Sequence, residues 1–265
     1  MKENSLLSRR DLLAKALKTG AALGFGAIAA GALGNFSSSF SEIFEPKALA
    51  AIPTGALDFA ATEPCVLTCS ATLGPCYYAA NLVRRDITEG KAGLPTRLGF
   101  RVVNADTCDP IQNASIDIWH TDSQGIYSAP ISTFCNGTDS SVQSQRFGRG
   151  IQLTDANGWA YFDTIYPGWY SSRTTHIHAT VRLNNTAIVT TQFFFLDRVS
   201  EFIYRSHPNY SNRPNRDTTN TSDNVIGGAL SRSLPYVFST KLVNNKYLQA
   251  VKTIGIRTSA TTCNA

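Results

Sequence analysis

Short runs of alternating apolar and polar residues constrain the fold of this chain more than any other feature. Turns rich in Asn, Asp, Gly and Ser separate five such runs, which span residues 98–104, 115–120, 159–166, 176–183 and 187–195. Alternation with a period of two is typical of strands that bury one face, and turns at this spacing are typical of antiparallel sandwiches. The sequence therefore predicts an all-β, antiparallel β-sandwich.

The segments around these runs predict long connections and one domain. Asn184-Asn185-Thr186 predicts a tight hairpin between the last two runs. Residues 51–64 predict an extended N-terminal arm, and residues 206–222, rich in Asn, Arg, Pro and Thr, predict a long ordered loop. No internal repeat is present, so we expect a single β-sandwich domain over residues 51–265.

The first fifty residues predict an export signal. A Gly/Ala-rich apolar run over residues 19–34 follows Ser8-Arg9-Arg10-Asp11-Leu12-Leu13, and Ala48-Leu49-Ala50 supplies the small residues that a signal peptidase accepts. This order resembles a twin-arginine signal over residues 1–50. A transmembrane anchor is the alternative, but the run is glycine-rich and shorter than the ~20 strongly apolar residues of a span. We expect export to the periplasm or the cell exterior, with no stable membrane anchor.

The cysteines follow this segment and predict disulfides. Six are present, at positions 65, 69, 76, 108, 135 and 263. An even count in an exported chain is typical of structural disulfides, and six cysteines leave 15 pairings open. A cluster of thiolate metal ligands is the alternative, but no C-x-x-C pair occurs.

The charge balance gives no reason to expect a nucleic-acid partner. Lys and Arg number 24 against 19 Asp and Glu, and part of this surplus lies in the first fifty residues. No stripe dense in Lys or Arg follows, and such a stripe is the electrostatic signature of nucleic-acid binding.

Residues that carry chemistry gather in two stretches. The first, residues 117–127, is a strand that leads into a glycine-containing turn and ends at Tyr127. The second, residues 164–178, contains Tyr170, His176 and His178. Residues two apart share one face of a strand, so the two imidazoles can converge on one metal ion. Taken alone this pair is a weak signal, and a zinc or copper site on the two histidines stays an alternative.

Five collinear segments between about residues 63 and 195 resemble the intradiol ring-cleavage dioxygenases, which include catechol and protocatechuate dioxygenases. They are G-P-C-Y-Y from Gly74, R-D-I-T-E-G from Arg85, W-H-x-D-x-x-G-x-Y ending at Tyr127, R-G-I-Q-L-T-D from Arg149, and residues 164–178. The resemblance implies a non-haem Fe(III) site whose four ligands are Tyr127, Tyr170, His176 and His178.

The chemistry of ferric iron agrees with this ligand set. Fe(III) favours anionic oxygen, and a phenol with an ordinary pKa of about 10 can ionise when such a cation compensates its charge. The two-histidine, one-carboxylate arrangement of Fe(II) oxygenases fits less well, because residues 170–178 contain no Asp or Glu. Asp122 is the nearby acidic rival, although it could instead cap the turn that holds Tyr127.

The resemblance also implies an activity and further residue roles. It implies Fe(III)-dependent intradiol cleavage of small catechol-type diols with O2 to cis,cis-muconate-type diacids. Tyr170 would act as a base when it leaves the metal, and Arg173 would stabilise negative charge on the substrate ring. Tyr77, Tyr78 and Gln192 would contact the substrate.

Two departures from the family pattern bear on substrate specificity and on disulfide pairing. His176 follows Tyr170 by only six positions, a shorter interval than in the catechol and protocatechuate enzymes, which predicts a more open site. No basic cluster marks a carboxylate subsite, which favours plain or substituted catechols over protocatechuate. Thr121 stands where several exported members carry a cysteine, so the disulfide pairing cannot be transferred from them.

Two questions stay open at this point. A secreted β-sandwich binding module without catalytic activity is the alternative from another functional class, because a fold does not establish an activity. A homodimer that pairs through an exposed sheet edge is compatible with the sequence, but no residue pattern requires it.

Overall fold

The structure is a computed structural model that describes residues 64–227 and 234–257. The predicted export signal, and all but the last residue of the predicted N-terminal arm, lie outside these ranges. Within them, no helix has both the length and the apolar character that a membrane crossing requires.

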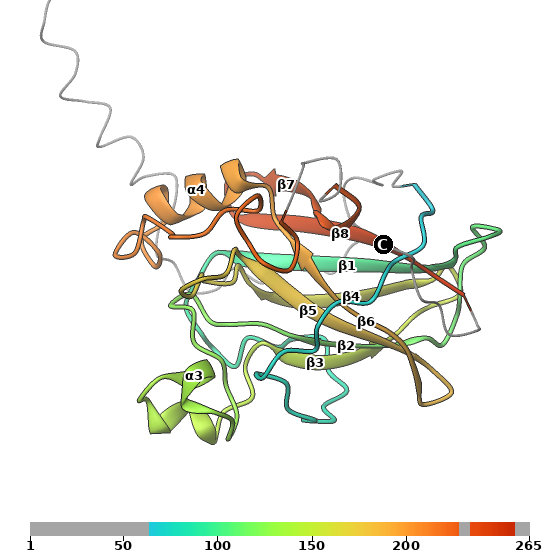
Figure 1. The fold of residues 1–265 in the computed structure, drawn as a ribbon, viewed down its shortest axis with the longest axis horizontal. Helices are drawn as coiled ribbons and strands as arrows, with labels where there is room; N and C mark the ends of the chain where they lie inside the picture. The colour runs from blue at the N-terminus through green and yellow to red at the C-terminus, as the bar shows by residue number, and fades with distance from the viewer. Residues whose placement is uncertain (1–63, 228–233, 258–265) are drawn as a thin grey trace, which may run out of the picture. The chain divides into compact units, whose positions relative to one another are not determined.

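Two four-stranded sheets pack face to face in the described residues (Figure 1). The first sheet has the order β4-β1-β8-β7, and the second has the order β3-β2-β5-β6. This arrangement confirms the predicted sandwich. The strands are β1 (Pro95–Asn104), β2 (Ser115–Trp119), β3 (Arg149–Leu153), β4 (Trp159–Ile165), β5 (His176–Leu183), β6 (Thr186–Phe194), β7 (Ser239–Val243) and β8 (Tyr247–Ile256).

The strand pairing differs from the prediction at one ladder. β1 and β8 pair in parallel, whereas the other ladders between these strands are antiparallel. Parallel strands require a long crossover connection, and β1 and β8 are separated by most of the domain. Local alternation cannot reveal such a pairing, because the two partners are distant in the sequence.

The core lies between the two sheets and is rich in aromatic side chains. Phe100 of β1 contacts Phe162 in its own sheet and Phe193 of β6 in the facing sheet, with ring centroids 6.1 and 5.7 Å away. Ile177 of β5 is fully buried in the same cluster. Side chains alternate along a strand, so His176 and His178 must lie on the outer face of the second sheet.

The predicted runs correspond to β1, β2, β4, β5 and β6, with ends that shift by a few residues. Asn184 and Asn185 form the predicted hairpin with φ of 48° and 65°, the left-handed backbone of a tight two-residue turn. The strands β3, β7 and β8 were not among the predicted runs. β8 is buried at every position, so it lacks the alternation that marks a half-exposed strand.

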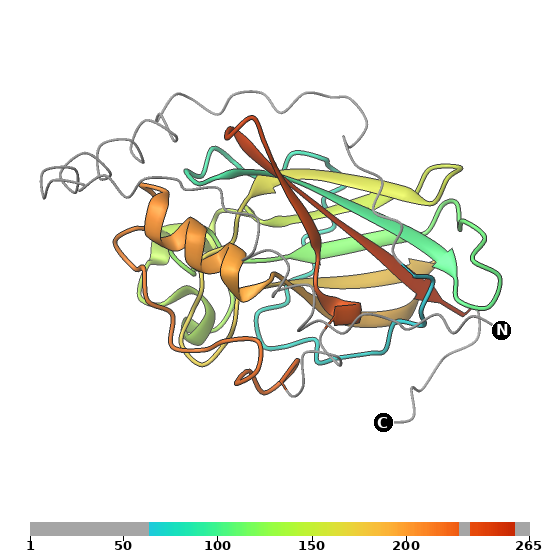
Figure 2. The same ribbon diagram turned by 90° about the horizontal axis from the view of Figure 1, so that it is seen from above.

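Within residues 64–227 and 234–257, helical structure is sparse and lies at the margins of the sandwich. Figures 1 and 2 show α4 (Asp197–Ser206) beside the first sheet, and Figure 1 shows the short α3 (Thr133–Asn136) apart from both sheets. Two 3-10 turns cover Ser140–Gln143 and Leu234–Tyr236. Residues 207–222 form the predicted long loop, built of turns.

The described cysteines form disulfides, as the sequence predicts. Cys65 pairs with Cys108, and Cys76 pairs with Cys135. Cys69 is disulfide-bonded as well. The Cys76–Cys135 bond ties the segment that precedes β1 to α3, which places a covalent link close to Tyr127.

A buried histidine joins the two sheets and makes the fold sensitive to acid. His120, at the end of β2, donates from Nδ1 to the Thr121 carbonyl at 2.7 Å and accepts at Nε2 from the Thr164 hydroxyl of β4 at 2.8 Å. Burial lowers the pKa of His120 from 6.5 to about 4. The unfolded chain therefore binds more protons than the folded chain between these two pH values.

We expect the free energy of unfolding to fall as the pH is lowered from about 6.5 to about 4, with His120 contributing up to about 3 kcal/mol. Above pH 6.5 this contribution to stability is fully present. Urea denaturation at several pH values should show a shallower pH dependence for His120→Gln than for the wild type. Equal slopes over this window would show that His120 does not titrate as its burial requires.

Candidate metal centre

β5 carries two neighbouring imidazoles on the outer face of the second sheet. His176 lies opposite Phe194 of β6, and His178 lies between Trp119 of β2 and Gln192 of β6. The two ring centroids are 4.9 Å apart, and both side chains are buried. The strand thus brings together the histidine pair that the sequence singled out.

Tyr127 reaches this face from the turn that follows β2. The Asp122 carboxylate accepts hydrogen bonds from the backbone N–H groups of Gln124 and Ile126 at 2.9 and 3.0 Å. The Tyr127 N–H donates to the Cys135 carbonyl at 3.0 Å. Asp122 therefore caps the turn. The sequence allowed two roles for this residue, turn capping and metal ligation.

Tyr170 lies on a loop that packs backbone to backbone against this turn. The Gly168 N–H donates to the Asp122 carbonyl at 2.8 Å, and the Thr121 hydroxyl donates to the Gly168 carbonyl at 2.7 Å. A Cβ on Gly125 would collide with the Trp169 carbonyl, and a Cβ on Gly168 would collide with the backbone of Ser123. The absence of side chains at both glycines lets the two tyrosine-bearing segments meet.

The long loop over residues 207–222 holds the outer side of the Tyr170 segment. Trp169 donates from Nε1 to the Arg213 carbonyl at 2.9 Å, and the Arg213 guanidinium lies 4.2 Å from the Trp169 ring centroid. The Asp217 carboxylate accepts from the Ser171 hydroxyl at 2.7 Å. This polar loop therefore fixes the segment that carries Tyr170. The alternation pattern alone gives no indication of that role.

Three donor atoms meet at the centre of this arrangement. His176 Nε2 lies 3.2 Å from the Tyr170 hydroxyl and 3.5 Å from the Tyr127 hydroxyl. Its Nδ1 lies 2.6 Å from the Thr174 carbonyl, which holds the ring proton on Nδ1 and leaves the Nε2 lone pair facing the two phenols. A metal-binding histidine usually makes such a hydrogen bond from the ring nitrogen that does not face the metal.

His178 is the second imidazole at the centre, and an aromatic ring holds it in place. Its ring stacks on Trp119 with centroids 4.9 Å apart and an interplanar angle of 12°. Its Nδ1 is buried without a hydrogen-bond partner. A buried polar atom without a hydrogen-bond partner is uncommon in proteins, and an ion or other ligand bound at the imidazole would account for it.

The donor set fits a metal ion that accepts both nitrogen and anionic oxygen. Bonds of about 2 Å from a shared metal to nitrogen and oxygen donors place those donors about 3 Å from one another, close to the distances around His176 Nε2. Among the described residues, no three His, Cys, Asp or Glu side chains gather into a metal site. The two phenols together with the two imidazoles make four candidate donors.

The electrostatics of the centre favour neutral imidazoles. Burial lowers the pKa of His176 to about 3 and lowers the pKa of His178 well below its ordinary value. Burial also raises the pKa of Tyr127 and of Tyr170. Neutral imidazoles are ready metal donors, and a cation at the centre would supply the charge that turns each phenol into a phenolate.

Arg173 lies beside the centre in a fixed position. Its Nη1 is 3.5 Å from the Tyr170 hydroxyl, its Nε donates to Asp223 at 2.8 Å, and its Nη2 donates to the Gln192 side-chain oxygen at 2.5 Å. Gln192 in turn donates to the Thr72 carbonyl at 2.9 Å. Asp223 was missed by the sequence reasoning, because it lies in a Ser/Thr/Asn-rich loop where no motif or periodicity marks it.

The two predicted substrate contacts in the N-terminal segment have different surroundings. Tyr77 packs edge-on against Trp119 at 4.7 Å and donates from its hydroxyl to Asp117 at 3.0 Å. It thus stands behind the Trp119–His178 stack. The Tyr78 ring instead lies 4.8 Å from the Arg146 guanidinium.

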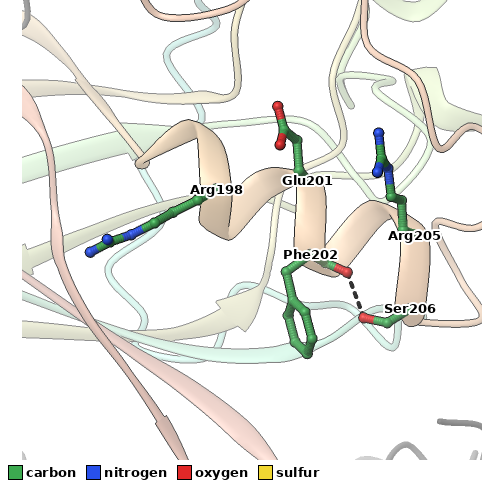
Figure 3. Close-up of a pocket in the computed structure, with 5 residues that line it drawn as sticks. All are labelled: Arg198, Glu201, Phe202, Arg205 and Ser206. Carbon is green, nitrogen blue, oxygen red and sulfur yellow. Dashed lines mark hydrogen bonds between the residues drawn. The ribbon is translucent and has the colours of Figure 1, made fainter. Parts of the chain in front are cut away.

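A separate surface depression lies on α4 (Figure 3). Its volume is about 450 Å³, and none of its lining residues belongs to the donor set. It is lined by Arg198, Glu201, Phe202, Arg205 and Ser206.

Comparison with known proteins agrees with this geometry. Residues 74–204 match a family model described as Dioxygenase. An intradiol ring-cleavage dioxygenase from Tetranychus urticae is similar to this chain over 72% of its length, with 27% identity and a TM-score of 0.62, and 94% of the T. urticae chain is covered. The chain belongs to the intradiol ring-cleavage dioxygenase family.

More distant structures support the fold of this dioxygenase family member. The 3-chlorocatechol 1,2-dioxygenase of Rhodococcus opacus 1CP is 16% identical, with a TM-score of 0.51 and coverage of 71% of this chain and 72% of that chain. A comparison with curated proteins gives no match.

The close approach of the two tyrosine-bearing segments can be tested with a pair of glycine substitutions. Gly125 and Gly90 both have positive φ, 82° and 75°, but a Cβ on Gly90 meets nothing within 4 Å. Gly90→Ala should lower the free energy of unfolding by about 1–2 kcal/mol through backbone strain alone. Gly125→Ala should lower the free energy of unfolding by about 2 kcal/mol more than Gly90→Ala does, because the backbone must also shift.

Urea denaturation of the two variants and the wild type measures this difference. Equal losses in the two variants would show that the loops tolerate a side chain at position 125, and that their contact does not constrain the centre.

Proposed function

We propose that this dioxygenase binds one Fe(III) through Tyr127, Tyr170, His176 and His178. We propose further that it cleaves catechol-type diols between the two hydroxylated carbons, with O2, to cis,cis-muconate-type diacids. The observation that carries the proposal is the contact of His176 Nε2 with two phenol oxygens beside a second buried imidazole. Family membership supports the reaction class.

The donor chemistry supports ferric iron over softer or divalent ions. Phenolate oxygen is a hard anionic donor, and two phenolates offset two of the three positive charges in a site that is largely shielded from water. Bound Fe(III) would supply a Lewis acid that holds both oxygens of the diol and withdraws electron density from its ring. A zinc or copper site on the histidines alone would leave the two phenols beside them without a role.

The two tyrosines differ in their exposure to solvent, so we assign them different roles. Tyr127 is buried, whereas Tyr170 is partly exposed and lies at the open side of the centre. Tyr170 is therefore the phenol that substrate can reach and displace. Its phenolate oxygen would accept one of the two protons that the diol loses on binding, while Tyr127 stays in place.

Arg173 would act on the substrate as a fixed cation. Asp223 and Gln192 hold its guanidinium beside the Tyr170 hydroxyl, so the group needs little reorganisation when negative charge develops on the bound ring. A planar guanidinium suits this role because its charge is permanent at neutral pH.

The disulfides support export of this enzyme. Structural disulfides persist in oxidising compartments and are rare in the bacterial cytosol. We infer that the chain works outside the cytosol. The twin-arginine route stays a prediction from residues 1–50, which lie outside the described ranges.

Purified mature protein, its metal content and a panel of catechols test the proposal directly. We expect about one iron per chain, a visible phenolate-to-iron charge-transfer band, O2 uptake on addition of catechol, and a muconate-type acid as product. A semialdehyde product would indicate extradiol cleavage and would overturn the reaction. Stoichiometric zinc or copper, or iron without O2 uptake, would favour the alternative site or a binding module.

A single substitution tests the role of Tyr170. Tyr170→Phe should retain part of the iron, because three donors remain, but turnover of catechol should fall by about a hundredfold or more when the base is lost. Tyr161→Phe is the matched control, since Tyr161 stacks on Trp159 in the first sheet, and its activity should match the wild type. Unchanged turnover in Tyr170→Phe would remove Tyr170 from this role.

A further inference from the structure

An exposed aromatic side chain stands beside the open side of the centre. Phe134 of α3 is 65% exposed, and its ring lies edge-on to the Tyr170 ring at 6.4 Å with an interplanar angle of 84°. Tyr170 is the proposed ligand that the substrate reaches first. Phe134 therefore places an exposed benzyl group beside Tyr170.

The backbone holds Phe134 firmly although its ring is exposed. Its neighbour Cys135 is buried and disulfide-bonded to Cys76, and the Cys135 carbonyl accepts from the Tyr127 N–H. Asn136 is buried and donates from its side chain to the Ala129 carbonyl at 3.2 Å. The backbone that carries the Phe134 ring is therefore held in place before a ligand binds.

The segment that carries a second exposed apolar side chain, Leu73, lies against the same centre. Leu73 is 43% exposed. The residues before and after Leu73 both lie close to the centre. The Thr72 carbonyl accepts from Gln192, and a Cβ on Gly74 would lie 3.1 Å from the His178 ring. Leu73 is three residues from Cys76, and Phe134 adjoins Cys135, so one disulfide links the two segments that carry these side chains.

Both segments are free of charge along their whole length. Residues 65–83 and 123–138 contain no Asp, Glu, Lys or Arg. Beyond Tyr170, Arg173 pairs with Asp223. Near these segments, Arg149 is buried and donates to the Cys76 and Ser128 carbonyls, and the Arg146 guanidinium lies 4.8 Å from the Tyr78 ring. The two segments that carry Leu73 and Phe134 therefore contribute exposed apolar side chains and no charge of their own.

We propose that Phe134 and Leu73 form an apolar platform that binds the ring substituent of the substrate. The preferred substrates of this enzyme are then catechols that carry a second aromatic ring, rather than unsubstituted catechol. The second ring packs against Phe134 in an edge-to-face or offset arrangement, and neither segment itself supplies a charged residue for an ionic substituent. This inference rests on the proposed catechol cleavage and specifies its substrate class.

Kinetics with catechol and 4-phenylcatechol test the platform. Phe134→Ala should lower kcat/KM for 4-phenylcatechol about three- to tenfold and change kcat/KM for catechol less than twofold. Phe134→Tyr keeps the ring and should restore the wild-type ratio of the two values. Phe202→Ala removes another exposed aromatic ring, on α4, and should leave both values unchanged.

Binding measured without oxygen separates this inference from the proposed reaction. Calorimetric titration of the iron-loaded protein under anaerobic conditions should show tighter binding of 4-phenylcatechol than of catechol, and Phe134→Ala should remove most of the difference. If the wild type shows this preference but cleaves neither diol, the platform stands and the proposed reaction fails. If catechol is cleaved but Phe134→Ala affects both diols equally in binding and in kcat/KM, the platform is wrong.

Discussion

The alternation of side chains along β5 couples the core of this protein to its centre. Ile177 fills the space between the sheets, and the residues on either side of it, His176 and His178, project from the opposite face. A shift of β5 by one residue would place both imidazoles in the core and Ile177 outside it. The apolar packing that stabilises the sandwich therefore also fixes the separation of the two histidines, and the rest of the centre is arranged around that pair.

Loops rather than strands bring the oxygen donors to the histidines. The Tyr127 turn is held by Asp122 and the Tyr170 segment by Asp217, and the two meet where glycines permit backbone contact. These supports are local hydrogen bonds and close contacts, which the core does not supply. A rigid sheet thus provides one half of the centre, and two braced loops provide the other half, in which Tyr170 is the more exposed of the two tyrosines.

The sequence predicted those parts of the molecule whose cause is local. Period-two alternation identifies β5 and its hairpin partner β6, and the spacing of His176 and His178 on one strand requires no knowledge of the fold. β8 escaped prediction because both of its faces are buried, and Asp223 escaped because its partner Arg173 is 50 residues away. The Cys76–Cys135 pairing was equally out of reach, since chain topology decides which of the open pairings forms. The family resemblance supplied the two tyrosines, but it could not show that Tyr77 stands behind Trp119 while Tyr78 packs on Arg146.

The short interval between Tyr170 and His176 explains why the substrate side of the centre is bordered by α3. Ser171 and Ser172 contact Asp217, Arg173 pairs with Asp223, and Thr174 orients His176, so these residues of the interval are committed to holding the loop. Such an interval has no residues left to extend over the mouth of the site. The surface next to Tyr170 is then formed by the disulfide-linked segments that carry Leu73 and Phe134. Substituent specificity in this enzyme would therefore depend on a covalently braced rim, so that changes in specificity need not disturb the loop that positions Tyr170 and Arg173.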